Sequence, residues 1–390
     1  MAQPTGSMAP AAAAPVAAGK ASASTTPAKT AIDGLFLADP PPMDPEWVQH
    51  EKDQNLPNPR PVLPPLQRQP LYVIECRELN TSMIAPGARD HHLAEGIDVQ
   101  PLRVPSTLDG YGIPLLAYSL TQDETSTAGH HPDYVVLYIH GGGLHIGEAD
   151  SEELPCRRIL KDARLPSKVD GQTPSLVVYS VGYRIMPQHP ASTCVSDCID
   201  AYRYVRAAHP DPSATKLLVV GSSSGGELAA FVGQEAARDA ARASSSAQLG
   251  VQGVVLRCPV TSDAFNGEDY IPAPLRPLHT SAANPKFATT LLGRMNRLVP
   301  RDGLPYMPLE APVELLAVQP RHWIQVCTND MLYSDGVCYA KALETAGAEV
   351  RVDPVVGWPH TFWLKAPWMD RALEADRAML RGLAWVAGGP

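Results

Sequence analysis

Several features are missing from this sequence, and each absence excludes a class of partner or location. No apolar run approaches the about 18–20 residues that a membrane-spanning helix needs. The chain has 32 Lys and Arg against 41 Asp and Glu, a net charge of −9, so no basic face for nucleic acid is indicated. The Ala-rich N-terminus lacks the basic region of a secretory signal. We therefore expect a cytoplasmic protein that binds no nucleic acid.

The seven cysteines contain no Cys-x-x-Cys pair, and their number is odd. This pattern favours free thiols in a reducing compartment over a disulfide framework. Cys194 and Cys198 are four residues apart and could share one face of a helix. No second pair of ligands accompanies them, so we expect no metal site there.

Composition divides the chain into three parts. Residues 1–32 are mainly Ala, Ser, Thr and Pro and are predicted to be disordered, because they can bury too little apolar surface to fold. Residues 33–90 remain rich in proline, but they carry aromatic side chains that could dock on a folded body. Residues 91–390 are expected to form the main domain.

From about residue 97, apolar runs of strand length alternate with helical patterns. The predicted strands are two around an Asp-Gly turn within 99–120, then 133–140, 174–181, 215–220, 251–260, 322–328 and 349–356. The predicted helices are 191–209, 224–243, 334–347 and 369–386. This alternation favours an α/β fold with a mostly parallel central sheet and helices on both faces. Residues 263–315 interrupt the pattern, so we predict an insertion above the ligand-binding edge of the sheet.

The motif Gly-Ser-Ser-Ser-Gly at 221–225 directly follows one of these strands. In the form Gly-x-Ser-x-Gly, the glycines allow a tight turn from strand to helix, and this register selects Ser223 over Ser222 and Ser224. A phosphate-binding loop is an alternative, but the Lys-Ser/Thr pair of such loops and a Gly-x-Gly-x-x-Gly pattern are both missing. Ser223 is therefore the candidate nucleophile.

A second loop, His-Gly-Gly-Gly-Leu-His-Ile-Gly, follows the strand at 133–140. Glycines let backbone N–H groups approach a ligand closely, as the stabilisation of a developing oxyanion requires. We expect Gly142 and Gly143 to supply such groups, together with the backbone N–H of Ser224. Leu144 and His145 are candidate substrate contacts, and a packed or solvated histidine is an equal alternative for the second of them.

A serine hydroxyl needs a histidine to take its proton and a carboxylate to orient that histidine. Asp330 and His360 each come just after one of the last two predicted strands. With Ser223 they occur in the order Ser, Asp, His, which this chemistry has on an α/β sheet. Asp335 is the rival acid, but it lies further from the strand end, where it could simply cap the next helix. The predicted catalytic residues are therefore Ser223, Asp330 and His360.

Six segments together resemble the hormone-sensitive lipase-like family of α/β-hydrolase esterases, over about residues 97–388. They are HGGG (140–143), GYRIMPQHP (182–190), DCIDAYRYV (197–205), GSSSGGELAA (221–230), DMLYSDGVCYAKAL (330–343) and GWPHTF (357–362). The family usually reads HGGG, YRLAPEHP, GDSAGG, DPLRDEG and HGF. The resemblance implies an α/β-hydrolase fold, no cofactor or metal, and the catalytic and oxyanion-hole residues named above. It also implies a mainly helical cap made from about residues 33–90 and 263–315.

Two departures from the family pattern lie beside the predicted nucleophile. Ser222 and Ser224 stand where the family usually has aspartate and alanine. The oxyanion hole uses a backbone N–H of Ser224, so the change of side chain should not abolish it. The sequence offers no physical reason for the serine at position 222.

These observations predict a serine carboxylesterase that cleaves a small or medium carboxylic ester through an acyl-enzyme on Ser223. One alternative is a lactone, amide or thioester hydrolase, or a tailoring enzyme of natural-product biosynthesis, with the same triad. Another is a ligand-binding protein on a hydrolase fold. The presence of His360 argues against the last, because plant hormone receptors of the family lack the triad histidine. The expected partner is a small-molecule ester; the oligomeric state stays open, with a homodimer as one alternative.

Overall fold

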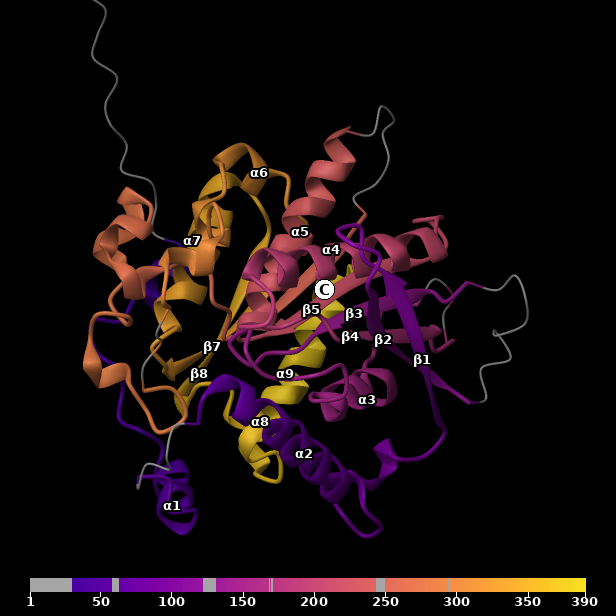
Figure 1. Ribbon diagram of the computed structural model, residues 1–390, viewed down its shortest axis with the longest axis horizontal. Coiled ribbons are helices and arrows are strands. Elements are labelled where there is room, and N and C mark those ends of the chain that lie inside the picture. Colours follow the sequence, from indigo (N-terminus) through magenta and orange to yellow (C-terminus); the bar gives the residue numbers. More distant parts are fainter. Residues whose placement is uncertain are drawn as a thin grey trace, which may run out of the picture.

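The computed structural model describes residues 30–57, 63–121, 131–167, 169, 171–242, 250–293, 295 and 297–390. Its centre is an eight-stranded sheet with the order β1-β2-β4-β3-β5-β6-β7-β8 (Figure 1). The strands are β1 Ile97–Pro105, β2 Gly112–Leu120, β3 Tyr134–Ile139, β4 Leu176–Val181, β5 Lys216–Ser222, β6 Gly253–Arg257, β7 Arg321–Asn329 and β8 Val350–Pro359. Only the pairs β1–β2 and β2–β4 are antiparallel. The predicted α/β fold with a mostly parallel sheet is confirmed.

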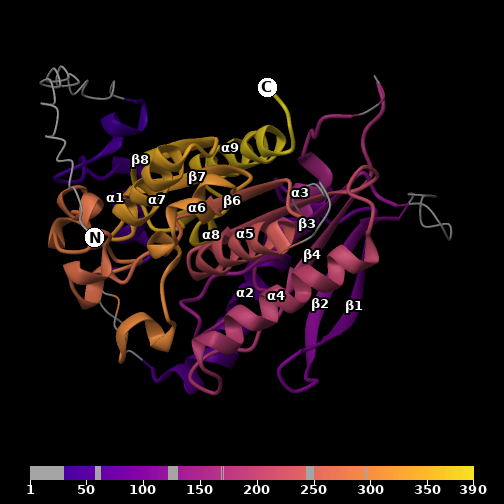
Figure 2. The ribbon, with the colours of Figure 1, turned by 90° about the horizontal axis from the view of Figure 1, so that it is seen from above.

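Helices cover both faces of this sheet, with α4 and α5 on one side and α3 and α9 on the other (Figure 2). The helices are α1 Pro45–Asp53, α2 Pro65–Ile84, α3 Glu153–Asp162, α4 Ala191–Ala208, α5 Ser224–Arg242, α6 Val313–Ala317, α7 Tyr333–Ala346, α8 Phe362–Lys365 and α9 Asp370–Val386. Within the described ranges, no helix combines the length and the apolar character that crossing a membrane requires.

Strand β3 illustrates why the buried strands read as continuous apolar runs. Val135 and Leu137 pack with α4, α5 and α7, whereas Val136 and Tyr138 pack with α3 and α9. Successive side chains of a strand point to opposite faces, so a sheet covered on both sides buries every residue. All six residues of β3 are buried accordingly.

Helix α3 is an element that the sequence patterns did not predict. Its apolar residues Leu154, Cys156, Ile159 and Leu160 are buried, but charged residues between them obscure the helical period. Pro155 is tolerated because it lies in the first turn, where its missing N–H would have no partner within the helix.

The N-terminal part of the chain and the insertion contain helices of two kinds. Of the expected disordered tail, residues 1–29 lie outside the described residues, while Ile32 is buried and begins a short 3-10 helix. Helices α1 and α2 lie within 33–90. The insertion between β6 and β7 consists mainly of short 3-10 helices, because its frequent prolines start helices but cannot continue them. These are Ala264–Asn266, Glu268–Tyr270, Ala273–Leu278, Pro285–Phe287, Pro300–Gly303 and Pro308–Glu310.

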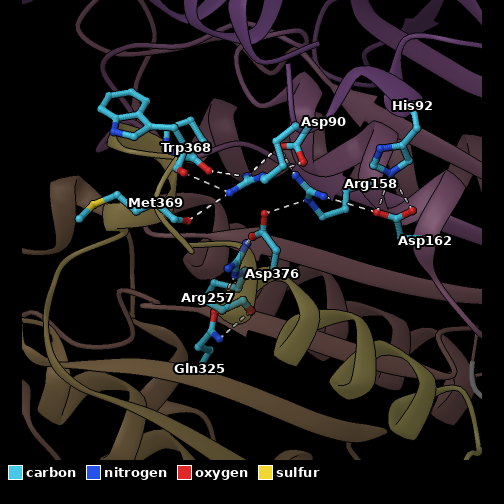
Figure 3. A network of polar contacts seen from close by, with 12 residues as sticks. Asp90, His92, Arg158, Asp162, Arg257, Gln325, Trp368, Met369 and Asp376 are labelled. Atoms are coloured by element: carbon cyan, nitrogen blue, oxygen red, sulfur yellow. Dashed lines mark hydrogen bonds and ion pairs between the residues drawn. The ribbon is translucent and has the colours of Figure 1, made fainter. Parts of the chain in front are cut away.

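A buried network of charges joins α3, α9 and β6 beneath the sheet (Figure 3). Arg158 on α3 contacts Asp90 at 2.7 Å and Asp376 on α9 at 3.1 Å. The same Asp376 contacts Arg257, the last residue of β6, at 3.0 Å, and Arg257 also donates to Gln325 on β7. Each guanidinium therefore has carboxylate partners that offset part of the free-energy cost of its burial.

Candidate active site

Four loops meet at one edge of the sheet, because each follows the carboxyl end of a parallel strand. Ser223 follows β5, Asp330 follows β7, and His360 follows β8. The glycine-rich loop that begins with His140 follows β3, the direct neighbour of β5. The topology alone thus brings the predicted nucleophile, base, acid and oxyanion loop to one place.

The three predicted catalytic side chains form a continuous chain of hydrogen bonds. His360 Nε2 lies 2.9 Å from Ser223 Oγ, and His360 Nδ1 lies 2.7 Å from Asp330 Oδ2. The other oxygen of Asp330 accepts the backbone N–H of Leu332 at 2.9 Å, which fixes the carboxylate. With Nδ1 donating to Asp330, His360 presents Nε2 as an acceptor to the serine hydroxyl, the arrangement that a general base requires.

The backbone at Ser223 has the conformation of a tight strand-to-helix turn, with φ at +55°. A Cβ at Gly221 would lie 2.1 Å from the carbonyl oxygen of Gly225, and a Cβ at Gly225 would lie 2.1 Å from the carbonyl oxygen of Ile139. No side chain fits at either position. The two glycines therefore permit a turn that exposes Ser223 to the cavity.

The neighbouring serines have other partners. Ser222 is buried, and its hydroxyl donates to Glu152 Oε2 at 3.1 Å. Ser224 is also buried, and its Oγ accepts the backbone N–H of Leu144 at 3.2 Å. Of the three serines, only Ser223 contacts His360.

The neighbours of His360 set its titration against the effect of burial. Burial alone would lower the pKa of His360, but the charge and hydrogen bond of Asp330, together with the contact to Cys258, raise this pKa to about 10. The imidazolium is thus strongly stabilised, as it must be when the histidine accepts a proton during the reaction.

A thiol lies beside the same pair. Candidate metal-ligating atoms of Cys258, Asp330 and His360 lie within 4.8 Å of one another, and this group is the single such cluster in the described part of the chain. Burial raises the pKa of the Cys258 thiol, but contacts with Cys327 and His360 outweigh it and bring the pKa to about 7. A metal ion here would compete with the Asp330–His360 hydrogen bond, so the arrangement fits a hydrogen-bonded triad better than a metal centre.

The glycine-rich loop lines the same cavity as Ser223. Gly142 and Gly143 have φ of +117° and +64°. A Cβ at Gly142 would lie 2.0 Å from the carbonyl oxygen of Ile146, so this position admits only glycine. Among the described residues, neither glycine N–H has a hydrogen-bond partner. Ser224 is the first residue of α5, and the N–H of a residue at this position has no partner within the helix. These three N–H groups are those expected for an oxyanion hole.

His140, the first residue of this loop, is a structural residue. Its Nδ1 lies 2.7 Å from the carbonyl oxygen of Gly141, and its ring stacks on Tyr183 with centroids 4.3 Å apart. Burial lowers the pKa of His140 to about 4, so the ring stays neutral at physiological pH. Tyr183 donates in turn to the carbonyl oxygen of His140 at 2.9 Å and fixes the start of the loop.

A cavity of about 340 Å³ opens in front of Ser223. Both predicted substrate contacts, Leu144 and His145, line it. Its other apolar lining residues include Val260, Leu291, Leu292, Met295, Leu332 and Leu364. The insertion contributes Leu291, Leu292 and Met295, Leu332 directly precedes α7, and Leu364 lies in α8, so parts of the chain far apart in sequence together form the walls.

The rival acid, Asp335, belongs to a different cluster. It contacts His279 Nε2 at 2.6 Å and accepts from Ser262 Oγ at 2.5 Å. Nε2 of His279 faces both groups, and Nδ1 of the same ring has no hydrogen-bond partner among the residues that the structure describes. This His–Asp–Ser set therefore cannot pass a proton from serine to histidine as the first set can. Instead it attaches the insertion to α7.

Sequence reasoning missed two residues of the site, Glu152 and Cys258. Cys258 follows β6 directly, so the rule that function gathers at carboxyl strand ends could have selected it. Glu152 lies in an acidic loop before a helix that was not predicted, and no local pattern distinguishes it.

An open α/β sheet with a hydrogen-bonded Ser–His–Asp set beside unpaired N–H groups defines the class of serine hydrolases. The family model of the alpha/beta hydrolase fold matches residues 136–364. The chain belongs to this family, in its hormone-sensitive lipase-like branch, and is a serine carboxylic-ester hydrolase.

Curated relatives and solved structures agree with this assignment. Ethyl acetate hydrolase of Pseudomonas putida is 30% identical over 272 residues, which cover 69% of this chain and 77% of that enzyme. Esterase LipI of Mycobacterium tuberculosis is 30% identical over 258 residues, which cover 65% of this chain and 73% of the relative. The structure of a hyperthermophilic esterase from Pyrobaculum calidifontis has a TM-score of 0.66 at 22% identity and covers 89% of this chain and 99% of its own. The structure of vibralactone cyclase has a TM-score of 0.70 at 19% identity, and the match covers 89% of this chain and 95% of the cyclase chain. The structural likenesses support the fold.

Proposed function

We propose that this esterase cleaves small or medium carboxylic esters through an acyl-enzyme on Ser223. The observation that carries the proposal is the unbroken hydrogen-bond chain from Ser223 through His360 to Asp330. A serine hydroxyl is a weak nucleophile at neutral pH, and this chain supplies the base and the orienting carboxylate that activate it.

In the acylation step, His360 Nε2 takes the hydroxyl proton as Ser223 Oγ attacks the ester carbonyl. The carbonyl oxygen becomes an oxyanion, which the N–H groups of Gly142, Gly143 and Ser224 stabilise. His360 then gives its proton to the leaving alcohol, and the acyl group remains on Ser223. Asp330 keeps the imidazolium stable and correctly oriented while it carries the proton.

In the deacylation step, a water molecule attacks the acyl-enzyme as His360 takes one of its protons. The same N–H groups hold the second oxyanion. Its collapse releases the carboxylic acid, and the proton returns from His360 to Ser223. The side chains and backbone groups supply every catalytic element of this cycle, so we infer that it needs no cofactor.

The size and lining of the cavity support the substrate class. About 340 Å³ is near the lower end of the range of small-molecule pockets, and the lining beside Ser223 is largely apolar. The lining also includes a charged cluster, in which Arg297 contacts Glu227 at 3.3 Å and Asp302 also at 3.3 Å. We propose that α2, α8 and the insertion act as the cap that limits acyl length.

Cysteine chemistry supports the proposed cytoplasmic location. All seven cysteines are free thiols, and Cys258 lies next to Cys327 without a disulfide between them. Such neighbouring thiols persist in a reducing compartment.

A series of p-nitrophenyl esters from acetate to palmitate, assayed on the wild type and on Ser223→Ala, tests the proposal. We expect the highest kcat/KM at short or medium acyl chains and loss of turnover in Ser223→Ala. A fluorophosphonate probe should label the wild type and not the variant. Turnover that survives in Ser223→Ala, or a strong preference for lactones, amides or thioesters over esters, would contradict it.

A further inference from the structure

Directly behind the catalytic serine lies a buried carboxylate, that of Glu152. Its side chain is only 3% exposed. Oε1 accepts the backbone N–H of Gly141 at 2.7 Å. Oε2 accepts the hydroxyl of Tyr138 at 2.5 Å and that of Ser222 at 3.1 Å. One carboxylate thus contacts β3, the end of β5 and the glycine-rich loop.

Two of these contacts are next to the reacting groups. Gly141 directly precedes the glycines whose N–H groups are unpaired, and Ser222 directly precedes Ser223. The loop and the turn are also in close contact, since a Cβ at Gly141 would lie 2.8 Å from the carbonyl oxygen of Ser222 and 3.1 Å from Ser223 Cβ. The distance between the nucleophile and the oxyanion-hole donors therefore depends on what joins Gly141 to Ser222, and Glu152 does so.

This carboxylate is costly to bury. Burial raises the pKa of Glu152, and the hydrogen bonds from Tyr138, Gly141 and Ser222 act against that shift. Among the described residues, Glu152 has no ion pair with a lysine, arginine or histidine, so these hydrogen bonds are its main stabilisation. An apolar side chain at position 152 would fill the same space without this cost, but it could not accept a hydrogen bond from the N–H of Gly141.

We propose that Glu152 is a positioning residue of the ester hydrolysis assigned above, on which this inference rests. Its carboxylate holds the N–H groups of Gly142 and Gly143 at a fixed distance from Ser223, so that they point to the oxyanion and not to the oxygen of the bound ester. Although Glu152 belongs to the wall of the cavity, it is almost fully buried, and its carboxylate acts through Gly141 and Ser222. The hydroxyl of Ser222, for which the sequence offered no role, is part of this support.

The test compares three variants of the full-length protein. Glu152→Ala removes all three contacts. Glu152→Gln can keep the contact with Gly141 through its amide oxygen, because the hydroxyls of Tyr138 and Ser222 can rotate to accept from its NH₂ group. Glu153→Gln is the matched control, since this neighbouring residue is partly exposed and, within the described part of the chain, its carboxylate pairs with Arg157 and with no group of the site. Active-site titration with a fluorophosphonate gives the concentration of folded, reactive enzyme in each preparation.

For p-nitrophenyl butyrate, kcat per titrated site in Glu152→Ala should fall about 10–100-fold, with KM within about threefold, as expected when oxyanion donors are displaced. The affinity for an alkyl trifluoromethyl ketone, which forms a stable oxyanion on the serine, should fall by the same factor as kcat/KM. Glu152→Gln should recover most of both losses, and Glu153→Gln should match the wild type. If Glu152→Ala does not fold, Glu152→Asp takes its place, since it is one methylene too short to reach both Gly141 and Ser222.

The proposal is wrong if kcat per titrated site in Glu152→Ala, or in Glu152→Asp, stays within twofold of the wild type. It is also wrong if Glu152→Gln loses as much as Glu152→Ala, or if kcat falls while the affinity for the ketone is unchanged. Failure of the esterase function itself looks different. In that case the wild type would show no turnover of esters, or Ser223→Ala would retain it.

Discussion

Replacement of Asp330 by asparagine removes one charge from the triad while it preserves the shape of the side chain. Oδ1 of Asp330 accepts the N–H of Leu332 at 2.9 Å, and Oδ2 lies 2.7 Å from His360 Nδ1. Asparagine keeps the contact with Leu332 only if its NH₂ group faces His360. That group is a donor, so His360 Nδ1 must become the acceptor and its proton must move to Nε2. In this tautomer Nε2 can no longer accept the proton of Ser223.

The expected loss is large because the wrong tautomer removes the general base. In a triad of this kind, the same change lowers kcat by about 10⁴-fold, which corresponds to about 5 kcal/mol of transition-state stabilisation. The pH dependence should change as well. Burial lowers the pKa of His360, but Asp330 and Cys258 together outweigh it and raise this pKa to about 10, and only neutral His360 can act as a base. In the wild type, kcat/KM therefore rises as pH increases toward that pKa, and in Asp330→Asn the residual activity should reach its plateau at lower pH.

The assay is the hydrolysis of p-nitrophenyl butyrate from pH 5 to 10, with each rate divided by the titrated active-site concentration. Asp335→Asn is the matched control, because Asp335 belongs to the cluster with His279 and not to the triad. It should lower stability and leave kcat per active site within about threefold of the wild type, since it changes no group that contacts the triad. Retention of more than a tenth of kcat in Asp330→Asn, or a larger loss in Asp335→Asn, would refute the assignment of the acid.

Three further substitutions test the backbone of the glycine-rich loop and the buried charges. Gly142→Ala places a Cβ 2.0 Å from the carbonyl oxygen of Ile146, so the loop must shift, and kcat should fall by at least about 10²-fold in the ester assay. Gly143→Ala meets no atom within 4 Å and should lose less; equal losses would contradict this view of the loop. Asp376→Asn removes the negative charge that Arg158 and Arg257 share. It should lower the free energy of unfolding by about 3–5 kcal/mol, measured by urea unfolding. An unchanged unfolding midpoint would show that the network contributes nothing.

The sheet and the triad could be predicted because their patterns are local. A buried parallel strand is a short apolar run, and Ser223, Asp330 and His360 each stand directly after one. The topology of the sheet then brings such strand ends together, so the spacing in sequence between the three residues does not matter. The glycines around Ser223 were informative for the same reason, since a tight strand-to-helix turn requires glycine at fixed positions within a motif of five residues.

Glu152 could not be predicted, because its role arises from contacts between segments far apart in the chain. It lies 70 residues from Ser222 in the sequence. No propensity or period links the two residues, and the helix that begins at Glu153 has charged residues that obscure its apolar face. The walls of the cavity were equally hard to predict, since proline-rich 3-10 segments give no periodic pattern from which inward-facing residues can be read.

The buried charges of Figure 3 set a condition on the synthesis of this protein. Asp376 follows Arg158 by 218 residues and Arg257 by 119 residues. At about 5–20 residues per second, a ribosome needs roughly 10–40 s to add the carboxylate that Arg158 requires from α9. During that time Arg158 can pair with Asp90 and Asp162, but Arg257 has no carboxylate partner among the described residues until Asp376 is made. Closure of this face of the sheet would bury that guanidinium without compensation, so we expect the face to stay open to water or to a chaperone. The last helix thus decides when the nascent chain can complete its fold.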